Sequence, residues 1–385
     1  MVEFSLTPEQ VAFQEEVLKF CRKEIAPLAE EADREGKFCW EAWRKMGEFG
    51  LLGLPFPAEY GGGDADVLTA VLAGEAMGRG GAEGGLLLSW GAHTYLCGDT
   101  IYKNGNEEQK KKYLPKIASG EWVGAMGLTE PDAGSDAASI RTTATRKGDV
   151  YVLNGTKMFI TNGPIADVLC VYATVNRELK HMGITGFIVE KGFPGFSVGK
   201  KLNKMGVRAS TTSELIFEDC VVPKENLLGE EGKGFLAALG TLEWDRSALL
   251  APTVGGFEYI LEQCARYAKE RKQFGRPIAE FQAIQHKLAD IKVFIEALRL
   301  LIYRVAWYKD QGRPLNHLEA AIAKLMAGDW GMLCASEAVQ IHGGYGYIHE
   351  YPVERLFRDT KLGSIGGGTS EIQKTIISKM MRMSD

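Results

Sequence analysis

The amino-acid sequence predicts an α+β protein in which a β-rich domain lies between two helical domains. Helical patterns dominate residues 1–118, β-rich runs at short spacing occupy 119–228, and long helical segments fill 229–385. The chain has 385 residues, of which 45% are hydrophobic, so it can bury cores in two or three domains. We therefore expect three domains with the bounds 1–118, 119–228 and 229–385.

The first domain is predicted to begin with a capped helix. Thr7 suits the N-cap, Pro8 suits the first helical position, and Gln10 completes a capping box with Thr7. Further helical patterns follow, and the glycine cluster at 61–63 interrupts them.

The middle domain carries strand patterns and turn signals. Residues 150–153 and 158–160 flank Asn154-Gly155, a dipeptide that is typical of a two-residue hairpin turn. Residues 168–175, 186–189 and 214–217 are further β-rich runs. The sequence thus predicts a hairpin with its turn at 154–155 inside a compact β domain.

The last domain shows helical periodicity over about 235–268, 280–310 and 316–341. Segments of these lengths are typical of a helix bundle. No internal repeat or low-complexity segment interrupts them.

Charge and hydropathy exclude several classes of partner. The net charge is −5 with acidic and basic residues mixed throughout, so no basic stripe indicates nucleic acid. No apolar run reaches the ~20 residues of a membrane helix. The first residues lack the pattern of a targeting signal, so we expect a cytoplasmic protein, or one of an organelle matrix if a targeting peptide has been removed.

The seven cysteines are scattered, mostly among apolar neighbours, and include no C-x-x-C pair. We expect reduced thiols in the core of an intracellular protein. Nor does any group of His, Cys, Asp and Glu show metal-ligand spacing, so we expect no metal site.

Five short motifs follow one another in a fixed order. They lie at 127–136 (GLTEPDAGSD), 153–157 (LNGTK), 271–275 (RKQFG), 340–344 (QIHGG) and 368–370 (GTS). Together, in this order and spacing, they resemble the acyl-CoA dehydrogenase family over essentially the whole chain. A closer likeness to the isovaleryl-CoA dehydrogenase branch lies at 91–93, 104–107 and 214–220.

The resemblance implies an N-terminal helical domain, a middle β-barrel and a C-terminal four-helix bundle. It also implies an FAD cofactor and an acyl-CoA substrate. The family forms a homotetramer that holds each FAD between subunits, and it passes electrons to an electron-transfer flavoprotein.

Residues of the first two motifs match the family's flavin contacts. Thr129 and the amide of Leu128 would meet the pyrimidine edge, and Phe159 and Thr161 would lie against the ring system. Ser135 would bond the pyrophosphate, since Gly134 lets backbone N–H groups approach the anion; Ser135 is also expected to contact substrate. Read without the family, Thr129 and Thr161 could be ordinary strand residues.

A second set matches contacts to the FAD of a neighbouring subunit. Arg271 offers a planar, permanently charged donor fork for the pyrophosphate. The same resemblance assigns cofactor binding to Gln273, Phe274, Gln340, Gly344 and Thr369. The alternative for Arg271 is a solvated arginine at a helix end.

The reaction needs a carboxylate that takes the α-proton of the thioester. Many family members carry a glutamate where this chain has Gly367, whose N–H would still bond the thioester oxygen. The isovaleryl-CoA branch has its glutamate before an arginine on a helix, and the matching residues here are Asp245 and Arg246. Asp245 is therefore the candidate base, with Arg246 and Gly366 at the substrate. A structural carboxylate, paired with Arg246 or a lysine, is the alternative for Asp245.

Small side chains near the base suggest room for a branched or cyclic acyl group. Gly363, Gly366 and Gly367 either leave this volume or only permit a tight turn. Trp90, His93 and Tyr95 would line the acyl pocket, and His93 would either handle protons or be packed with a shared hydrogen bond.

The leading hypothesis is α,β-dehydrogenation of a branched-chain or cyclic acyl-CoA. Alternatives on the same fold are oxidation at another ring carbon, an acyl group on a carrier protein, a flavin monooxygenase and a catalytically silent flavoprotein.

Overall fold

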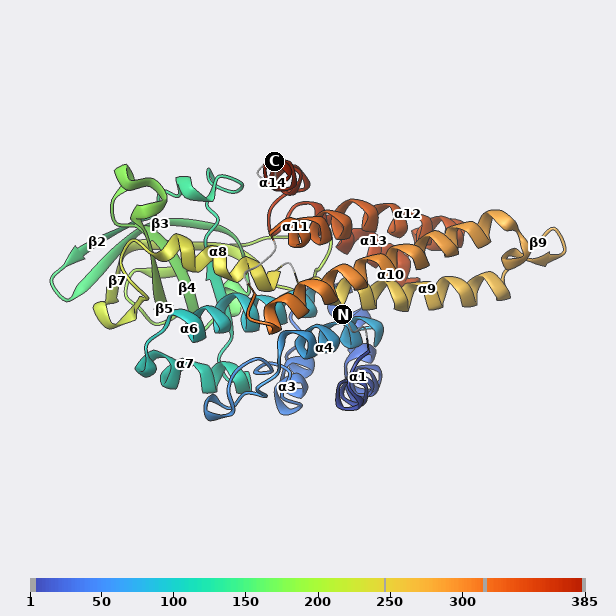
Figure 1. Cartoon of the computed structure of the whole chain (residues 1–385), viewed down its shortest axis with the longest axis horizontal. Coiled ribbons are helices and arrows are strands. Elements are labelled where there is room, and N and C mark those ends of the chain that lie inside the picture. Colours follow the sequence, from blue (N-terminus) through green and yellow to red (C-terminus); the bar gives the residue numbers. More distant parts are fainter. Residues whose placement is uncertain (1–4, 246, 314–316, 383–385) are drawn as a thin grey trace.

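The computed structural model describes residues 5–245, 247–313 and 317–382, with the backbone alone for 242–245 and 382. Helices come first, strands follow, and helices return, so the predicted α+β class and order are confirmed (Figure 1). The strands lie at one end of an elongated molecule, and a long arm of C-terminal helices extends from them to the other end.

The N-terminal part is helical, as predicted. The capping box forms, since Gln10 N–H donates to Thr7 Oγ1 at 3.2 Å and Thr7 N–H donates to Gln10 Oε1 at 3.1 Å. Gly61–Gly63 lie in the loop before α4. The helices are α1 (Pro8–Phe20), α2 (Ala29–Glu35), α3 (Trp40–Glu48), α4 (Val67–Arg79), α5 (Gly84–Gly91), α6 (Asp99–Asn104) and α7 (Glu107–Ser119), with a π-helical segment, η4 (Ala92–Gly98), between α5 and α6.

Eight strands form one sheet whose pairing runs β6-β7-β3-β2-β4-β5-β8, with β1 parallel to β4. A separate two-stranded hairpin, β9–β10, caps the helical arm (Figure 1). The strands are β1 (Gly124–Gly127), β2 (Thr143–Lys147), β3 (Val150–Thr161), β4 (Val168–Thr174), β5 (Ile184–Glu190), β6 (Phe196–Lys201), β7 (Thr212–Pro223), β8 (Leu227–Leu228), β9 (Lys272–Gln273) and β10 (Arg276–Pro277).

The predicted hairpin turn at Asn154-Gly155 is wrong. β3 runs straight through both residues, and the register against β7 shifts there, which is a β-bulge. Gly155 has φ 149°, and a Cβ on it would lie 2.7 Å from the Cα of Thr142. The glycine thus serves a bulge against a neighbouring segment, and the actual hairpin joins β2 to β3 around Gly148.

The predicted long helix over 235–268 is two helices, α8 (Gly234–Asp245) and α9 (Ala251–Glu270). Pro252 lies in the first turn of α9, where proline's missing N–H and fixed φ favour a helix start over a helix interior. The remaining helices are α10 (Gln282–Asp310), α11 (His317–Leu325), α12 (Gly331–His342), α13 (Pro352–Thr360) and α14 (Ser370–Arg382), with a π-helical turn, η10 (Met326–Trp330), joining α11 to α12.

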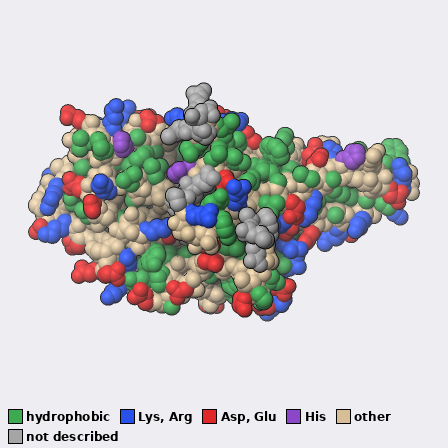
Figure 2. Space-filling view, viewed as in Figure 1, with side chains coloured by type: hydrophobic (Ala, Val, Ile, Leu, Met, Phe, Trp, Pro, Cys, Tyr) green, Lys and Arg blue, Asp and Glu red, His purple; other side chains and the backbone are tan. Residues whose placement is uncertain are grey.

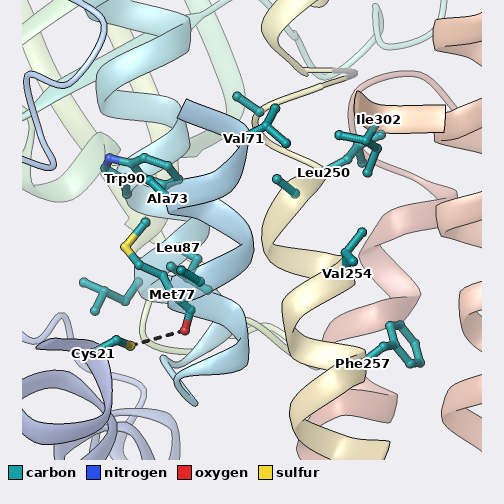
Figure 3. Packing of buried hydrophobic residues seen from close by; sticks show 14 of the residues in the cluster. Cys21, Val71, Ala73, Met77, Leu87, Trp90, Leu250, Val254, Phe257 and Ile302 are labelled. Carbon is teal, nitrogen blue, oxygen red and sulfur yellow. Dashed lines mark hydrogen bonds between the residues drawn. The ribbon is translucent and has the colours of Figure 1, made fainter. Parts of the chain in front are cut away.

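The largest hydrophobic core is shared by the N-terminal and C-terminal helices. Figure 3 shows Val71 on the side of α4 that faces α9, which carries Val254 and Phe257, and Met77 on the other side of α4, beside Cys21. Glycines let the two helices approach closely, because a Cβ on Gly255 would lie 1.9 Å from the carbonyl oxygen of Glu75. The helical parts at the two ends of the chain therefore form one packed unit.

All seven cysteines are free thiols, and six of them are buried. Cys97 of η4 and Cys170 of β4 bring their sulfurs to 3.9 Å at the border of the helical and β domains. None of the helices in the described ranges is long and apolar enough to cross a bilayer.

Candidate functional site

The loop after β1 holds Leu128 and Thr129, and two bonds from β3 fix it. Met158 N–H donates to the carbonyl oxygen of Thr129 at 2.8 Å. The ammonium Nζ of Lys157 donates to the carbonyl oxygen of Leu128 at 3.1 Å. Both loop side chains are half-buried.

Lys157 is fully buried and forms an ion pair with buried Glu130, with 2.7 Å between Nζ and Oε1. Burial lowers the pKa of Lys157 to about 8 against the opposing attraction of Glu130. Burial would raise the pKa of Glu130, but Lys157 and hydrogen bonds to the Glu130 carboxylate outweigh it and hold that pKa below its ordinary value. Two of those bonds come from the backbone N–H groups of Arg141 and Thr142.

Phe159 lies on a strained bulge beside this loop. The register between β3 and β7 shifts between Lys157 and Ile160, and Phe159 has φ 60°, which is rare for an aromatic residue. Its ring is 67% exposed. Two residues on, Thr161 pairs with Thr212 and is half-buried. Thr129, Phe159 and Thr161 therefore meet at one end of β3, as the sequence predicts.

Ser135 lies in the exposed loop between β1 and β2. A bridge between Glu130 and Ala133 turns the chain just before it, and a Cβ on Gly134 would contact nothing within 4 Å. The hydroxyl is thus presented to solvent on an open turn.

Residues from the third and fourth motifs meet at the far end of the helical arm. A hollow of about 620 Å³ is lined there by Arg271, Gln273, Gln340 and Gly344, with aromatic side chains at its wall. The guanidinium of Arg271 lies 5.6 Å from the ring centre of Tyr345. The sequence therefore placed these four residues in one site.

Phe274 is at the tip of the β9–β10 hairpin. It has φ 52° and its ring is 93% exposed. Its ring is therefore accessible to another molecule at the end of a projecting hairpin.

The residues expected at the flavin ring and those expected at the pyrophosphate lie at opposite ends of the molecule. β3, with Phe159 and Thr161, belongs to the sheet, whereas β9, with Gln273, is the tip of the helical arm (Figure 1). One copy of the chain therefore does not join them into a single site.

The loop that carries Gly366, Gly367 and Thr369 precedes α14. Gly367 and Gly368 have φ 65° and 94°, values that favour glycine. The buried side chain of Gln373 donates from Nε2 to the carbonyl oxygen of Gly368 at 3.1 Å. Thr369 Oγ1 accepts a bond from Ile372 N–H at 3.3 Å, as an N-cap does.

Gly363 has a packing role instead of leaving an open volume. A Cβ on it would lie 3.3 Å from the Cα of Gly328 in η10. A Cβ on Gly366 would meet the Leu362 side chain at 3.4 Å, an ordinary contact. Of these two glycines, Gly366 is the one with room beside it.

The candidate base falls at the edge of what the structure describes. Asp245 is the last residue of α8, and its side chain lies outside the described set. Arg246 lies outside the described residues altogether.

Trp90, His93 and Tyr95 are all fully buried. His93 Nδ1 accepts from Gly124 N–H at 2.9 Å, so its proton lies on Nε2, which donates to the carbonyl oxygen of Ile117, also at 2.9 Å. Burial lowers its pKa to about 4. Of the two roles considered for His93, the structure supports a packed histidine with shared hydrogen bonds and gives no support for proton transfer.

Sequence reasoning missed one cavity, a hollow of about 230 Å³ between α6 and α8. Asp99 and Lys103 line it and form an ion pair at 2.7 Å, and Lys233, Gly240 and Thr241 line the α8 side. The i,i+4 spacing of Asp99 and Lys103 was a visible signal for the pair, but nothing in the sequence indicated the space beside it.

These residues fit an FAD. Phe159, an exposed ring held on strained backbone beside Thr129 and Thr161, suits the face and edge of a flat ring system. At the other end, Arg271 and the amides of Gln273 and Gln340 suit phosphate and ribose oxygens in an aromatic-walled hollow.

Three family models match the chain in order. They are the N-terminal domain of acyl-CoA dehydrogenase at residues 7–121, its middle domain at 125–220 and its C-terminal domain at 232–382.

Curated relatives cover nearly the whole chain. A short-chain-specific acyl-CoA dehydrogenase of Clostridium acetobutylicum is 46% identical over 98% of this chain and 99% of its own length. A mitochondrial isovaleryl-CoA dehydrogenase of Solanum tuberosum is 45% identical over 96% of this chain and 90% of its own length.

Solved structures agree in fold. Butyryl-CoA dehydrogenase from Megasphaera elsdenii is 43% identical with a TM-score of 0.94, covering 99% of this chain and 100% of that one. The prolyl acyl carrier protein oxidase AnaB is 40% identical with a TM-score of 0.95, covering 98% and 100%. PigA with FAD and proline is 33% identical with a TM-score of 0.96, covering 100% of both chains.

Proposed function

Because the chain belongs to the acyl-CoA dehydrogenase family, and so is an FAD-dependent oxidoreductase acting on CH–CH bonds, we propose that it oxidises the Cα–Cβ bond of a branched-chain or cyclic acyl-CoA. Asp245 is the base in this proposal. Gly367 supplies the donor for the thioester oxygen.

The observation that carries the choice of base is the composition of the loop before α14. Residues 361–370 contain no Asp or Glu, so this loop offers no carboxylate. α8 ends in a carboxylate, Asp245, which is therefore the residue we assign as the base.

The chain's own groups divide the chemistry between them. The Asp245 carboxylate takes the proton from Cα, and the N–H of Gly367 donates to the thioester oxygen, which gains negative charge as that proton leaves. FAD, when bound, would supply the acceptor for the hydride from Cβ. Gly367 and Gly368 have positive φ, which glycine adopts without the steric cost that a Cβ adds.

The test is anaerobic bleaching of the holoprotein by straight, branched and cyclic acyl-CoAs. Asp245→Asn keeps the size of the side chain and removes its basicity. We expect it to retain FAD and to lose reduction by the best substrate by at least about a hundredfold.

Glu243→Gln is the matched control. Two residues away on a helix, position 243 faces a different direction from 245, so this variant should bleach like the wild type. If the flavin of Asp245→Asn were bleached as fully as that of the wild type, Asp245 would not be the base. If only straight-chain acyl-CoAs bleached the wild-type flavin, the proposed branched or cyclic substrate class would be wrong.

A carrier-bound acyl group is the second candidate, because AnaB, a prolyl acyl carrier protein oxidase, and a glutaryl-coenzyme A dehydrogenase are both 40% identical to this chain. Offering the same acyl group on CoA and on a phosphopantetheinyl carrier protein separates the two. Faster reduction by the carrier-bound form would favour this candidate.

We also propose that each FAD-binding site is completed between two subunits of a homotetramer. An electron-transfer flavoprotein then takes up the electrons from the reduced enzyme. The shared site is supported by the positions of the two groups of expected cofactor contacts, which lie at opposite ends of a single subunit.

A further inference from the structure

The buried ion pair under the Leu128–Thr129 loop is more elaborate than packing requires. Lys157 is among the largest fully buried side chains, and moving an ammonium group from water into a protein interior costs several kcal/mol unless it is paired and hydrogen-bonded. A methionine would fill the same space without that cost. The position of Nζ indicates what the charge does.

Nζ bonds two acceptors that lie close in sequence. It is 2.7 Å from Glu130 Oε1 and 3.1 Å from the carbonyl oxygen of Leu128. The aliphatic stem passes beneath β1, where a Cβ on Gly127 would lie 3.4 Å from Lys157 Cγ. The Lys157 side chain thus extends from β3 past the end of β1, and its ammonium group binds the carbonyl oxygen of the peptide between Leu128 and Thr129.

The orientation of one peptide follows from that bond. In a trans peptide the C=O and N–H point in opposite directions, and the oxygen of Leu128 shares its peptide with the nitrogen of Thr129. With the oxygen drawn inward by Lys157, the N–H of Thr129 points outward, and it donates to no acceptor among residues 5–245, 247–313 and 317–382.

The next peptide is held as well. The carbonyl oxygen of Thr129 accepts from Met158 N–H at 2.8 Å, and Met158 directly precedes the strained Phe159. Glu130 is locked on its other side by the N–H groups of Arg141 and Thr142. The loop is therefore fixed from β3 and from the segment before β2, and its outward face carries a free donor.

We propose that Lys157 is a positioning residue for the cofactor: through the Leu128 carbonyl it turns the Thr129 N–H, beside the Thr129 hydroxyl, toward the flavin edge. This inference rests on the proposed function, since it needs FAD at the loop. The ligand edge so recognised is a hydrogen-bond acceptor, such as a pyrimidine nitrogen or carbonyl oxygen of the flavin.

The test compares the wild-type holoprotein with Lys157→Met, Lys157→Met/Glu130→Gln and a control. The double variant removes both buried charges together, so it avoids the isolated carboxylate that Lys157→Met alone would leave. Lys224→Met is the control, because Lys224 forms a lysine–carboxylate pair with Asp149 at 2.6 Å in the same domain, with both side chains more than half exposed.

Three quantities are measured: the dissociation constant of FAD from its fluorescence, the midpoint potential of the bound flavin, and the melting temperature after FAD removal. We expect both Lys157 variants to raise the dissociation constant at least about tenfold and to shift the midpoint potential and the flavin spectrum. The control should match the wild type in all three.

The outcomes separate the claims. A purely structural Lys157 would lower the melting temperature of the double variant and leave its flavin potential and spectrum as in the wild type, which would overturn the inference. A wild type that binds no FAD would instead overturn the proposed function on which the inference depends.

Discussion

At the scale of single residues, His93 shows how a titratable group can be structural. Its imidazole bridges the end of α7 at Ile117 and the start of β1 at Gly124, and it packs edge-on against Trp43 with ring centres 4.8 Å apart. Protonation of Nδ1 would break the bond from Gly124, since a charged ring can only donate. The neutral ring therefore joins the helical and β domains.

The low pKa of His93 makes stability depend on pH. Its folded pKa, about 4, lies below the unfolded value near 6.5, so between these values the unfolded chain binds a proton that the folded chain does not. Stability is lost as the pH falls from 6.5 toward 4, by about 2 kcal/mol at pH 5 from this residue.

His93→Gln lacks that contribution. At pH 7.5 the variant should be less stable than the wild type, because a core bridge is altered, and at pH 5 the gap should narrow by about 2 kcal/mol. Urea unfolding of both proteins at the two pH values measures this. A gap that stays constant would show that His93 titrates normally.

At the scale of elements, the crossing of α4 and α9 depends on glycine. In Gly255→Ala the new Cβ would lie 1.9 Å from the carbonyl oxygen of Glu75, so the helices must separate. We expect a loss of about 1–3 kcal/mol or more, measured by chemical unfolding.

The neighbouring glycine provides the control for that change. A Cβ on Gly256 would meet only the Leu356 side chain, at 4.0 Å. Since alanine favours a helix over glycine by about 1 kcal/mol, Gly256→Ala should match or exceed the wild type. Equal losses in both variants would exclude close helix approach as the cause.

Elements were predictable where one local signal decided them. The capping box at Thr7 and the three-part order follow from spacing and periodicity alone, and the structure confirms both. Gly155 was misread because a glycine after asparagine can serve a turn or a bulge, and the choice depends on Thr142, which is distant in sequence.

The candidate site was also predictable only in part. Arg271, Gln273, Gln340 and Gly344 came together because the resemblance covers motifs far apart in the chain. The role of Lys157 could not be read, since lysines are mostly exposed and only the fold shows that this one is buried beneath the loop.

At the scale of the whole molecule, the residues near the β9–β10 hairpin and those at the end of β3 can form one FAD site only where two subunits are in contact. Large hydrophobic side chains of the C-terminal helices are exposed in the single chain, among them Val293, Leu300, Trp330 and Leu333. Figure 2 shows hydrophobic areas over these helices. Surfaces of this kind mark protein contacts, which agrees with the proposed tetramer.

Shared sites predict complementation between two defective variants. Arg271→Ala should weaken FAD binding, and Asp245→Asn should bind FAD without reduction. In hybrids of the two chains, a site that takes Asp245 from one subunit and Arg271 from the other is intact, so about a quarter of sites should regain activity on random pairing. Activity in co-expressed, doubly tagged hybrids measures this, and hybrids as inactive as each parent would place both residues in the same subunit's site.

The core shared by α4 and α9 also has a consequence for synthesis of the chain. α4 leaves the ribosome with its apolar face complete, but α9, which covers that face, is made only after the entire β domain. During that interval the nascent chain exposes Val71 and the rest of the α4 face that α9 covers, and exposed apolar surface of this kind promotes aggregation. We therefore expect chaperones that bind nascent chains to associate with this chain during synthesis, and a ribosome-stalled chain that ends before α9 to remain protease-sensitive in its helical part.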